Sequence, residues 1–403
     1  MSRKVNLAVA ATVTLVAMAV TFSITMVISM DMFNNTVSSV KSKERMYNKL
    51  SEIDRYVRDN EYFDINEDTL NDTIASGYML GISDKYARYY SAKAYTEKVG
   101  VETGRLMNIG VSVIKDASSG YARIIRVYDN SPASEIGLQV GGFITNIGDT
   151  NVRTMTDTAA INSALLGEEG TTVSITYLNP DRQEQPAVEL VRSNYTTTTV
   201  FTQLTDDGCG YVCIDAFSAT TGTEFRTAVE NLVNQGAKAL VFDLRNNTGD
   251  SLDAALVAAD YCVPAGLMAQ SQAKDGTLTD LRISDDHEIN IPMVCLVNGN
   301  TAGGAELFAN ALRKMAGASI VGTTTAGKGV VLSEPQSFSD GSAAVITTGL
   351  LLDNEGQTWN GTGLTPDIEA TLTADEQNSY YDFTVETDPQ INKAVTSVMA
   401  MVG

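Results

Sequence analysis

The side chains that usually carry hydrolytic chemistry are sparse in this sequence of 403 residues. Its single histidine, His287, lies in the polar run Ser-Asp-Asp-His-Glu and is expected to be a solvated loop residue. A Ser-His-Asp triad is not expected, because no Gly-x-Ser-x-Gly motif accompanies this histidine. Residues 64–68 carry acidic groups at calcium-like spacing but lack the glycine that the sixth loop position requires. We therefore predict no metal site and no cofactor.

Polar, glycine-containing loops offer a better candidate for a site. Residues 243–250 read Asp-Leu-Arg-Asn-Asn-Thr-Gly-Asp and follow an apolar stretch that is expected to be a buried strand. Loops at the carboxyl ends of such strands are where α/β sheets commonly place active sites. Two further loops read Val-Asn-Gly-Asn-Thr-Ala-Gly-Gly-Ala-Glu, at residues 297–306, and Gly-Lys-Gly-Val-Val-Leu, at residues 327–332.

The order and spacing of these three loops resemble the C-terminal processing peptidases. The first is similar to the family's D-L-R-N-N-P-G-G, with Thr248 for proline and Asp250 for the second glycine. The second resembles V-N-x-x-S-A-S-A-S-E, the third resembles G-K-G-x-x-Q, and residues 363–368 resemble the terminal G-I-T-P-D. The resemblance runs from about residue 77 to residue 370 and implies a ClpP/crotonase-like peptidase core.

In this family a serine attacks the peptide carbonyl, a neutral lysine takes its proton, a glutamine orients the amine, and two backbone amides stabilise the oxyanion. The resemblance places Lys328 at the base position, Gly303 at the nucleophile position and Leu332 at the glutamine position. Gly249 and Gly304 match the oxyanion-hole positions. A lysine can act as the base only if its pKa falls from about 10.4 toward roughly 7 to 8.

Most of the catalytic groups that the resemblance implies are missing. Gly303 has no side-chain oxygen or sulfur and therefore cannot form an acyl-enzyme. Leu332 cannot orient an amine, and Asp250 would place negative charge beside a developing oxyanion. Three departures together favour natural loss of activity over a single designed knockout. Thr301 lies nearby, but its hydroxyl is expected to point elsewhere. We predict a pseudopeptidase; the alternative is an active serine-type endopeptidase with a rearranged nucleophile.

A β-rich segment ahead of these loops resembles a PDZ domain. Residues 129–138 are similar to the G-S-P-A-x-x-A-G-L segment of bacterial PDZ domains, and residues 140–144 to their P-G-D-x-I turn. The family's G-I-G-V loop, which holds a peptide's terminal carboxylate, falls at Asn108, Ile109, Gly110 and Val111. The resemblance implies that protein or peptide C-termini add as a strand and bind these amides. The alternative is a PDZ fold that serves only as a packing module.

The elements that must hold the three loops alternate between strands and helices after Tyr195. Residues 211–217 and 239–244 are expected to be strands, and residues 223–235 an amphipathic helix that Gly236 ends. Alternating strands and helices predict an α/β core. The whole chain is therefore expected to be an α/β, multidomain protein with a β-rich PDZ-like domain inserted before this core.

Composition and the N-terminus indicate the compartment. The formal net charge of −21 argues against a nucleic-acid partner, because an acidic surface repels phosphates. Residues 5–30 carry no charge and are long enough to cross a hydrocarbon core of about 30 Å. Since Arg3 and Lys4 precede this stretch, we expect a single-pass protein of the cell membrane with a cytoplasmic N-terminus and an extracytoplasmic bulk. The alternative is a cleaved signal peptide, although residues 24–30 contain no small-x-small cleavage site.

The predicted domains are a cytoplasmic stub with a membrane anchor (1–30), a helical region (31–97), a PDZ-like domain (98–194), a peptidase-like core (195–385) and a helical tail (386–403). The helical region carries a narrow apolar stripe with helical spacing, formed by Met46, Leu50, Ile53 and Val57. This stripe supports a third hypothesis, a homodimeric envelope protein whose oligomer disappears when Leu50 and Ile53 are made polar. Among the cysteines, Cys262 and Cys295 are expected to be small core residues.

Overall fold

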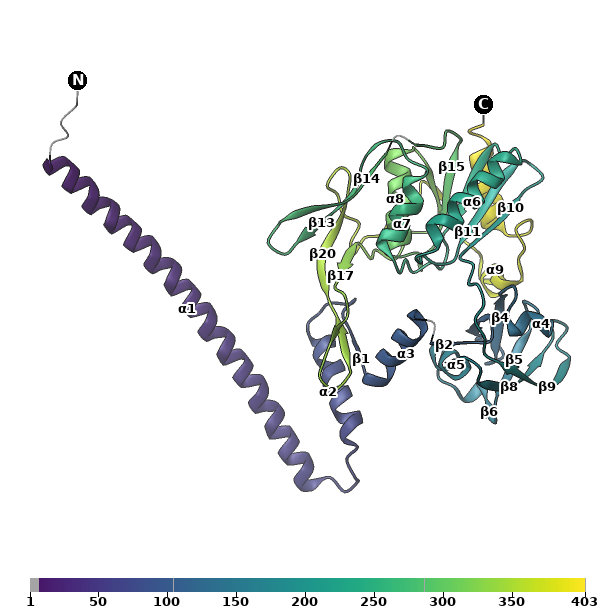
Figure 1. The fold of residues 1–403 in the computed structure, drawn as a ribbon, viewed down its shortest axis with the longest axis horizontal. Helices are drawn as coiled ribbons and strands as arrows, with labels where there is room; N and C mark the ends of the chain where they lie inside the picture. Colours follow the sequence, from purple (N-terminus) through teal and green to yellow (C-terminus); the bar gives the residue numbers. More distant parts are fainter. Residues whose placement is uncertain (1–6, 104, 286, 403) are drawn as a thin grey trace. The chain divides into compact units, whose positions relative to one another are not determined.

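The computed structural model describes residues 7–103, 105–285 and 287–402, and of residues 7–11, 31 and 33–39 only the backbone. The chain divides into two compact units, Met1–Thr73 and Ile74–Gly403. The first unit contains the long helix α1, Leu7–Asn60, which Figure 1 draws in purple. Arg3, Lys4 and Val5, on which the predicted membrane orientation depends, lie outside the described residues. Each unit is described separately below.

Helix α1 is long and apolar enough near its start to cross a membrane. Its segment Thr12–Met30 has a mean hydropathy of 2.1 and is not buried anywhere in the structure. A signal sequence near an N-terminus has the same properties, so length and composition alone do not separate the two alternatives. Farther along α1, the stripe residues Met46, Leu50 and Ile53 remain 39–49% exposed. Helix α1 is followed by α2, Glu67–Gly81, to which Arg58 is tied by an ion pair with Glu67 at 2.6 Å.

A β-rich domain forms the first part of the second unit. Its main sheet has the antiparallel order β3-β4-β5-β8-β9, and β6 pairs with β5. The sheet packs on an apolar core of its own, which includes Ile109, Ile124 and Ile161. The elements are β2 Leu106–Met107, β3 Val111–Lys115, β4 Ala122–Val127, α4 Pro132–Glu135, β5 Phe143–Ile147, β6 Thr150–Asn151, η1 Val152–Thr154, α5 Thr158–Leu165, β7 Gly167–Glu168, β8 Thr172–Leu178 and β9 Glu184–Val191.

The α/β core follows, and its central sheet has the order β10-β11-β12-β15-β16-β21. All pairs are parallel except that of the edge strand β10 with β11. The expected strand at 211–217 ends earlier, at Ile214, and the expected helix at 223–235 begins two residues earlier. The elements are β10 Val200–Leu204, β11 Cys209–Ile214, α6 Thr221–Asn234, β12 Ala239–Asp243, α7 Leu252–Asp260, β15 Met293–Val297, α8 Gly304–Met315, β16 Ser319–Gly322, β21 Ile368–Glu369 and α10 Pro389–Met399.

Both faces of this sheet are covered, which explains why β12 and β15 are buried along their whole lengths. On one face, Phe225, Phe242 and Phe308 pack edge to face or tilted between the sheet and the helices α6, α7 and α8. On the other face, α10 places Ile391 and Val395 against the strands. Figure 1 shows α7 and α8 on one side and the yellow α10 on the other. The core is therefore a three-layer α/β arrangement.

Smaller elements complete the second unit. An antiparallel sheet of order β14-β13-β20-β17 lies beside the core, and a second small sheet has the order β1-β19-β18. The cysteines are free, and Cys262 and Cys295 are buried in the core as predicted. The remaining elements are β1 Arg88–Tyr90, α3 Ala92–Glu102, β13 Gly266–Ala273, β14 Leu278–Ser284, β17 Val330–Leu332, β18 Gln336–Ser337, β19 Ala343–Val345, β20 Thr347–Asp353, α9 Ala374–Asn378 and η2 Tyr380–Asp382.

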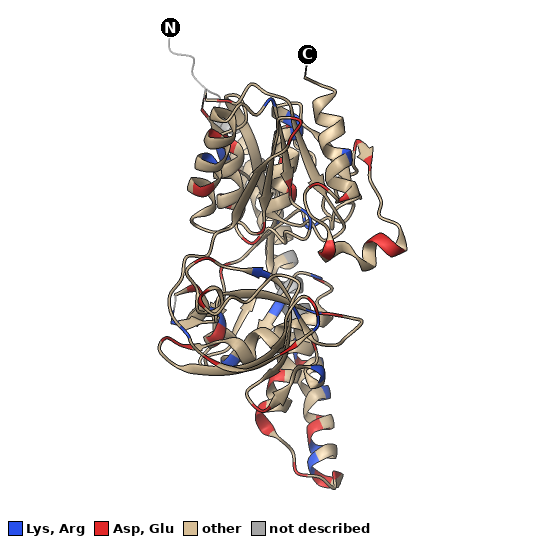
Figure 2. Cartoon of the chain, turned by 90° about the vertical axis from the view of Figure 1, so that its right-hand side faces the viewer, with Lys and Arg blue, Asp and Glu red and all other residues tan. Residues whose placement is uncertain are grey.

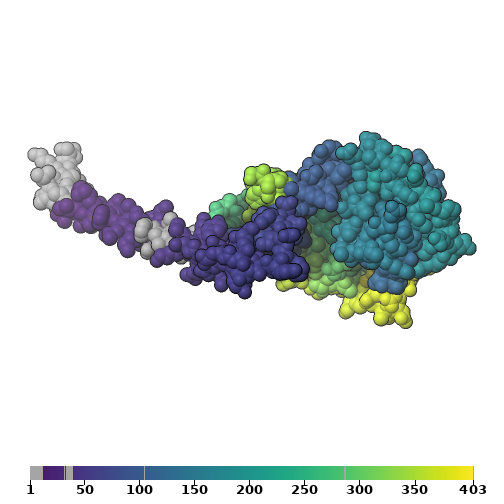
Figure 3. Space-filling view, turned by 90° about the horizontal axis from the view of Figure 1, so that it is seen from below, coloured from purple at the N-terminus to yellow at the C-terminus, as the bar shows by residue number. Residues whose placement is uncertain are grey.

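Two arginines of β4 join the β-rich domain to the core. Arg126 forms an ion pair with Asp215 at 2.5 Å and lies 3.6 Å over the ring of Phe201. Arg123 pairs with Asp382, which lies just after α9. Figure 3 shows this yellow segment beside the blue and teal surface of the β-rich domain. Acidic residues, red in Figure 2, are spread over many elements, in keeping with the net charge of −21.

Candidate functional site

The three candidate loops follow three adjacent parallel strands. The first follows β12, the second joins β15 to α8, and the third begins after β16 and runs through β17. Because the carboxyl ends of neighbouring parallel strands lie at the same edge of a sheet, the three loops meet there. The sheet order β12-β15-β16 therefore brings together segments that are far apart in the sequence.

Gly303 lies at the start of α8, and its backbone directs a side chain toward Lys328. A Cβ built at Gly303 would lie 3.6 Å from Lys328 Cδ and 2.9 Å from the carbonyl oxygen of Gly249. The φ and ψ angles of Gly303 are +55° and −118°, a conformation that residues with side chains rarely adopt. The position predicted for the nucleophile therefore faces the position predicted for the base, and it carries only hydrogen.

Lys328 is partly buried, and its surroundings act on its pKa in opposite directions. Burial lowers the pKa of Lys328, because the ammonium ion loses hydration. The carboxylate of Asp250 opposes this effect and raises the pKa, Arg88 lowers it, and Glu306 raises it. The net change is a lowered pKa. Asp250, which replaces a glycine of the family motif, thus favours the charged form of Lys328, which cannot act as a base.

The two amides that were expected to form an oxyanion hole are already used within the chain. The Gly249 N–H donates to Asn247 Oδ1 at 2.8 Å, and the Gly304 N–H donates to the Gly249 carbonyl at 3.1 Å. Gly249 itself is fixed in this position: its φ is +65°, and a Cβ would lie 2.1 Å from the carbonyl oxygen of Ala302. Both amides are thus bonded to oxygen atoms of the chain itself.

Leu332 and Thr301 offer no replacement for the missing groups. Leu332 is the last residue of β17 and brings an apolar side chain to the glutamine position. Thr301 is fully buried, and its hydroxyl donates to the carbonyl of Leu244 at 2.8 Å while accepting from the Asn298 N–H at 3.0 Å. The expectation that this hydroxyl points elsewhere is confirmed.

Glu306 connects the loops and was not assigned a role from the sequence. It is fully buried, and its two carboxyl oxygens accept four hydrogen bonds. The donors are the N–H groups of Gly303 (3.1 Å), Lys328 (2.8 Å) and Gly327 (2.8 Å) and the hydroxyl of Thr325 (2.5 Å). The signal available in the sequence was a glutamate three residues after a helix cap, the pattern of a capping box. Glu306 thus fixes Gly303 and Lys328 relative to each other.

Residues from the segment before the β-rich domain also hold the lysine loop. The Tyr86 hydroxyl donates to the Gly327 carbonyl at 2.7 Å, and Asp84 accepts from the N–H of Thr347 at 2.9 Å. These bonds place Asp84 and Tyr86 against the β17–β20 side of the site. The resemblance located this segment but gave no role to Tyr86.

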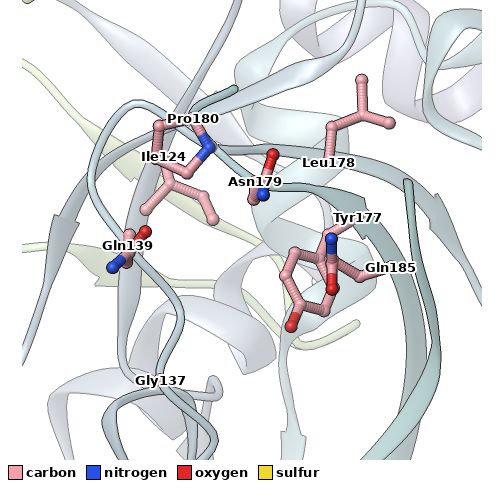
Figure 4. A pocket seen from close by; sticks show the side chains of 9 residues that line it. Ile124, Gly137, Gln139, Tyr177, Leu178, Asn179, Pro180 and Gln185 are labelled. Atoms are coloured by element: carbon pink, nitrogen blue, oxygen red, sulfur yellow. The ribbon is translucent and has the colours of Figure 1, made fainter. Parts of the chain in front are cut away.

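The other predicted site, residues 108–111, ends at the first residue of β3 in the β-rich domain. Its glycine is required, because Gly110 has a φ of +86° and a Cβ would lie 2.0 Å from Ser131 Cβ. A separate cavity of about 160 Å³ lies elsewhere in this domain, and Figure 4 shows its lining. Tyr177, Asn179 and Gln185 contribute polar groups to that cavity, which includes none of the predicted site residues.

The single histidine of the sequence lies outside the three loops. His287 is exposed and stacks on Tyr261 with ring centroids 4.5 Å apart. Within the described parts of the chain, no three His, Cys, Asp or Glu side chains gather in a way that could hold a metal ion. In the described loops, the partly buried Lys328 therefore lies near two carboxylates, those of Asp250 and Glu306, and near backbone amides that are bonded within the chain.

Comparison with known proteins finds a family match over the α/β core. Residues 208–370 match the model of peptidase family S41, and this stretch contains all three loops and the strands that hold them. This part of the chain is therefore similar to peptidase family S41. Of the serine, lysine and glutamine positions that the sequence resemblance predicts, only the lysine position carries the expected residue type, Lys328.

Relatives with processing functions support this assignment. The carboxy-terminal processing protease CtpA of Bacillus subtilis is 27% identical over 338 residues, which cover 83% of this chain and 71% of that protein. The carboxyl-terminal-processing protease of Synechocystis is 28% identical over 274 residues, which cover 67% of this chain and 64% of that protein. A putative S41 protease from Bacteroides fragilis shares the fold, with a TM-score of 0.58 and 19% identity over 85% of this chain and 92% of that one.

Proposed function

We propose that this protein is a membrane-anchored, extracytoplasmic pseudopeptidase that binds protein C-termini without cleaving them. The observation that carries the proposal is at position 303, where the backbone directs a side chain toward Lys328 and glycine supplies none. An acyl-enzyme requires a side-chain heteroatom at the attacking position. Lys328 is therefore left with no hydroxyl to deprotonate at that point.

The surroundings of Gly303 support the same conclusion. The amides of Gly249 and Gly304 are bonded within the chain, so stabilisation of an oxyanion would first require both bonds to break. Asp250 adds a negative charge close to Lys328, which opposes both oxyanion formation and deprotonation of the lysine. Restoring one serine would leave these obstacles in place.

The β-rich domain supports binding of C-termini in the manner of a PDZ domain. Strand β3 is an edge strand of its sheet, with α5 packed beside it, so an extended peptide can add along that edge. The loop at residues 108–111 leads directly into β3 and contains Gly110 at positive φ, which turns successive amides toward one side. For the membrane anchor, the support is the apolar segment Thr12–Met30 of α1.

The alternative is an active serine-type endopeptidase that trims extracytoplasmic proteins near their C-termini, as the names of the relatives describe for those proteins. The full-length protein in detergent is incubated with casein as an unfolded substrate, and fragments are identified by mass spectrometry. The Bacillus subtilis relative serves as the positive control. We expect no fragments from the protein or from Gly303→Ser. Cleavage by the unmodified protein that disappears in Lys328→Ala would establish the alternative.

A further inference from the structure

The side chain of Asn108 occupies the loop that is proposed to receive a peptide's terminal carboxylate. Asn108 Oδ1 accepts a hydrogen bond from the Gly110 N–H at 2.6 Å. Its Nδ2 donates to the carbonyl of Val111, the first residue of β3, at 3.1 Å. The carboxamide oxygen of Asn108 therefore already accepts the hydrogen bond of the middle amide of the loop. A ligand carboxylate that uses the same amide must displace this side chain.

A tyrosine from the following interdomain segment holds Asn108 in place. The Tyr195 hydroxyl donates to Asn108 Oδ1 at 2.5 Å, and the Tyr195 ring stacks on Tyr128 with centroids 5.7 Å apart. Burial raises the pKa of Tyr195 to about 12, so the phenol keeps its proton at neutral pH and remains a donor. Tyr195 lies in residues 192–199, which join β9 to β10. Asn108 thus links the loop to the segment that leads into the peptidase domain.

The far end of the β3 edge is also bonded within the chain. The Lys115 N–H donates to the Thr158 hydroxyl of α5 at 2.9 Å. Residues at even spacing on a strand present their backbone groups to the same edge, so Val111 and Lys115 lie on one edge of β3. Side chains of the domain itself therefore bond both ends of the edge that an added peptide strand would use.

We infer that Asn108 is a specificity-determining residue that competes internally with ligands bearing a free terminal carboxylate. The inference rests on the proposed function, in which residues 108–111 capture C-termini. A carboxylate forms stronger hydrogen bonds with amides than a neutral carboxamide does, so a C-terminus can displace Asn108 whereas an internal or amidated segment gains less. The observed affinity equals the intrinsic affinity multiplied by the fraction of molecules in which Asn108 does not occupy the Gly110 amide.

The test uses the full-length protein in detergent and a fluorescein-labelled octapeptide ending in valine, with either a free or an amidated C-terminus. Asn108→Ala removes the carboxamide at a position that has no positive φ. Its affinity for the free-acid peptide, measured by fluorescence polarisation, is expected to rise about tenfold, in line with two modest hydrogen bonds. Affinity for the amidated peptide stays unchanged. Tyr195→Phe keeps the ring and removes one bond, and it is expected to raise the free-acid affinity about threefold.

Asn151→Ala is the matched control, because this asparagine also accepts a backbone N–H, that of Arg153, but lies away from the loop. It is expected to change neither affinity. Amide hydrogen exchange at Gly110 should become faster in Asn108→Ala and stay unchanged in Asn151→Ala. If the unmodified protein prefers the free acid but Asn108→Ala binds it no more tightly, the inference fails and the proposed function stands. If none of the variants distinguishes free acid from amide, both fail.

Discussion

At the scale of single residues, position 303 combines a missing nucleophile with an unusual backbone. Gly303 has positive φ, and the carbonyl oxygen of Gly249 lies 2.9 Å from the site of a Cβ. Glycine adopts such a conformation without strain, whereas a residue with a Cβ does not. The orientation that would aim a serine at Lys328 therefore costs stability, and glycine removes that cost together with the reactive group.

Replacing Gly303 by serine tests this link directly. We expect Gly303→Ser to lower the free energy of unfolding by about 1–3 kcal/mol, the range for a strained backbone position. Urea denaturation followed by circular dichroism measures the change. The matched control is Gly299→Ser in the same loop, where φ is not positive and the nearest atom to a Cβ, the Thr324 oxygen, is 3.8 Å away. Equal stability of the two variants would contradict the strain argument.

Lys328 makes the stability of the folded protein depend on pH. Because burial lowers its pKa in the folded state, the unfolded chain, with an ordinary lysine pKa near 10.5, binds this proton more tightly. The contribution of Lys328 to the free energy of unfolding therefore increases as pH rises from the folded-state pKa toward 10.5. Below the folded-state pKa, the buried ammonium ion lowers the free energy of unfolding.

Lys328→Met isolates this contribution, because methionine keeps an unbranched chain and cannot titrate. We expect the variant to be more stable than the unmodified protein at neutral pH, with the difference shrinking as pH rises toward about 10.5. Urea denaturation of both proteins at several pH values gives the difference directly. A difference that does not vary with pH would show that burial leaves the pKa of Lys328 unchanged.

At the scale of elements, the start of α8 is held by Glu306 rather than by a polar cap residue. Gly303 is the N-cap and has no side chain to accept hydrogen bonds from the first turn. Glu306 instead reaches out of the helix to the Gly303 N–H and to the loop that carries Lys328. One buried carboxyl group thereby fixes the helix start and the neighbouring loop together.

Glu306→Gln is expected to lower the free energy of unfolding by about 2–4 kcal/mol, because the amide nitrogen would face backbone donors inside the protein. Glu376→Gln is the matched control. Glu376 occupies the same capping-box position in α9 but is only partly buried, and its loss should cost about 1 kcal/mol or less. Thermal and urea denaturation of both variants measure the contrast. A cost that is equal at the two sites would refute the role assigned to Glu306.

Sequence patterns located the elements of the core better than they located the contacts of the site. The apolar run at 239–244 and the helical spacing at 223–235 predicted β12 and α6, because burial on a sheet or helix face leaves a periodic signature. The motifs also predicted which loops meet. By contrast, the Gly249 and Gly304 amides bond within the chain because of the way the loops approach each other. Such an approach leaves no local pattern in the sequence.

The same limit applies to the β-rich domain. Asn108 stands where the loop of the PDZ resemblance has its first glycine. The side chain proves to matter more than the backbone, because it bonds Gly110, Val111 and Tyr195. Tyr195 lies 87 residues away in the sequence, so no periodicity or spacing rule connects the two positions.

At the scale of the whole molecule, helix α1 continues without a break from Thr12–Met30 to Asn60. If the apolar part crosses the bilayer, the remaining 30 residues add a rod of up to about 45 Å along the helix axis, at about 1.5 Å per residue. An extended chain covers about 3.3 Å per residue. A neighbouring membrane protein would then need a tail of about 14 extended residues to reach the tip of that rod. Neighbours with shorter tails would not reach the tip.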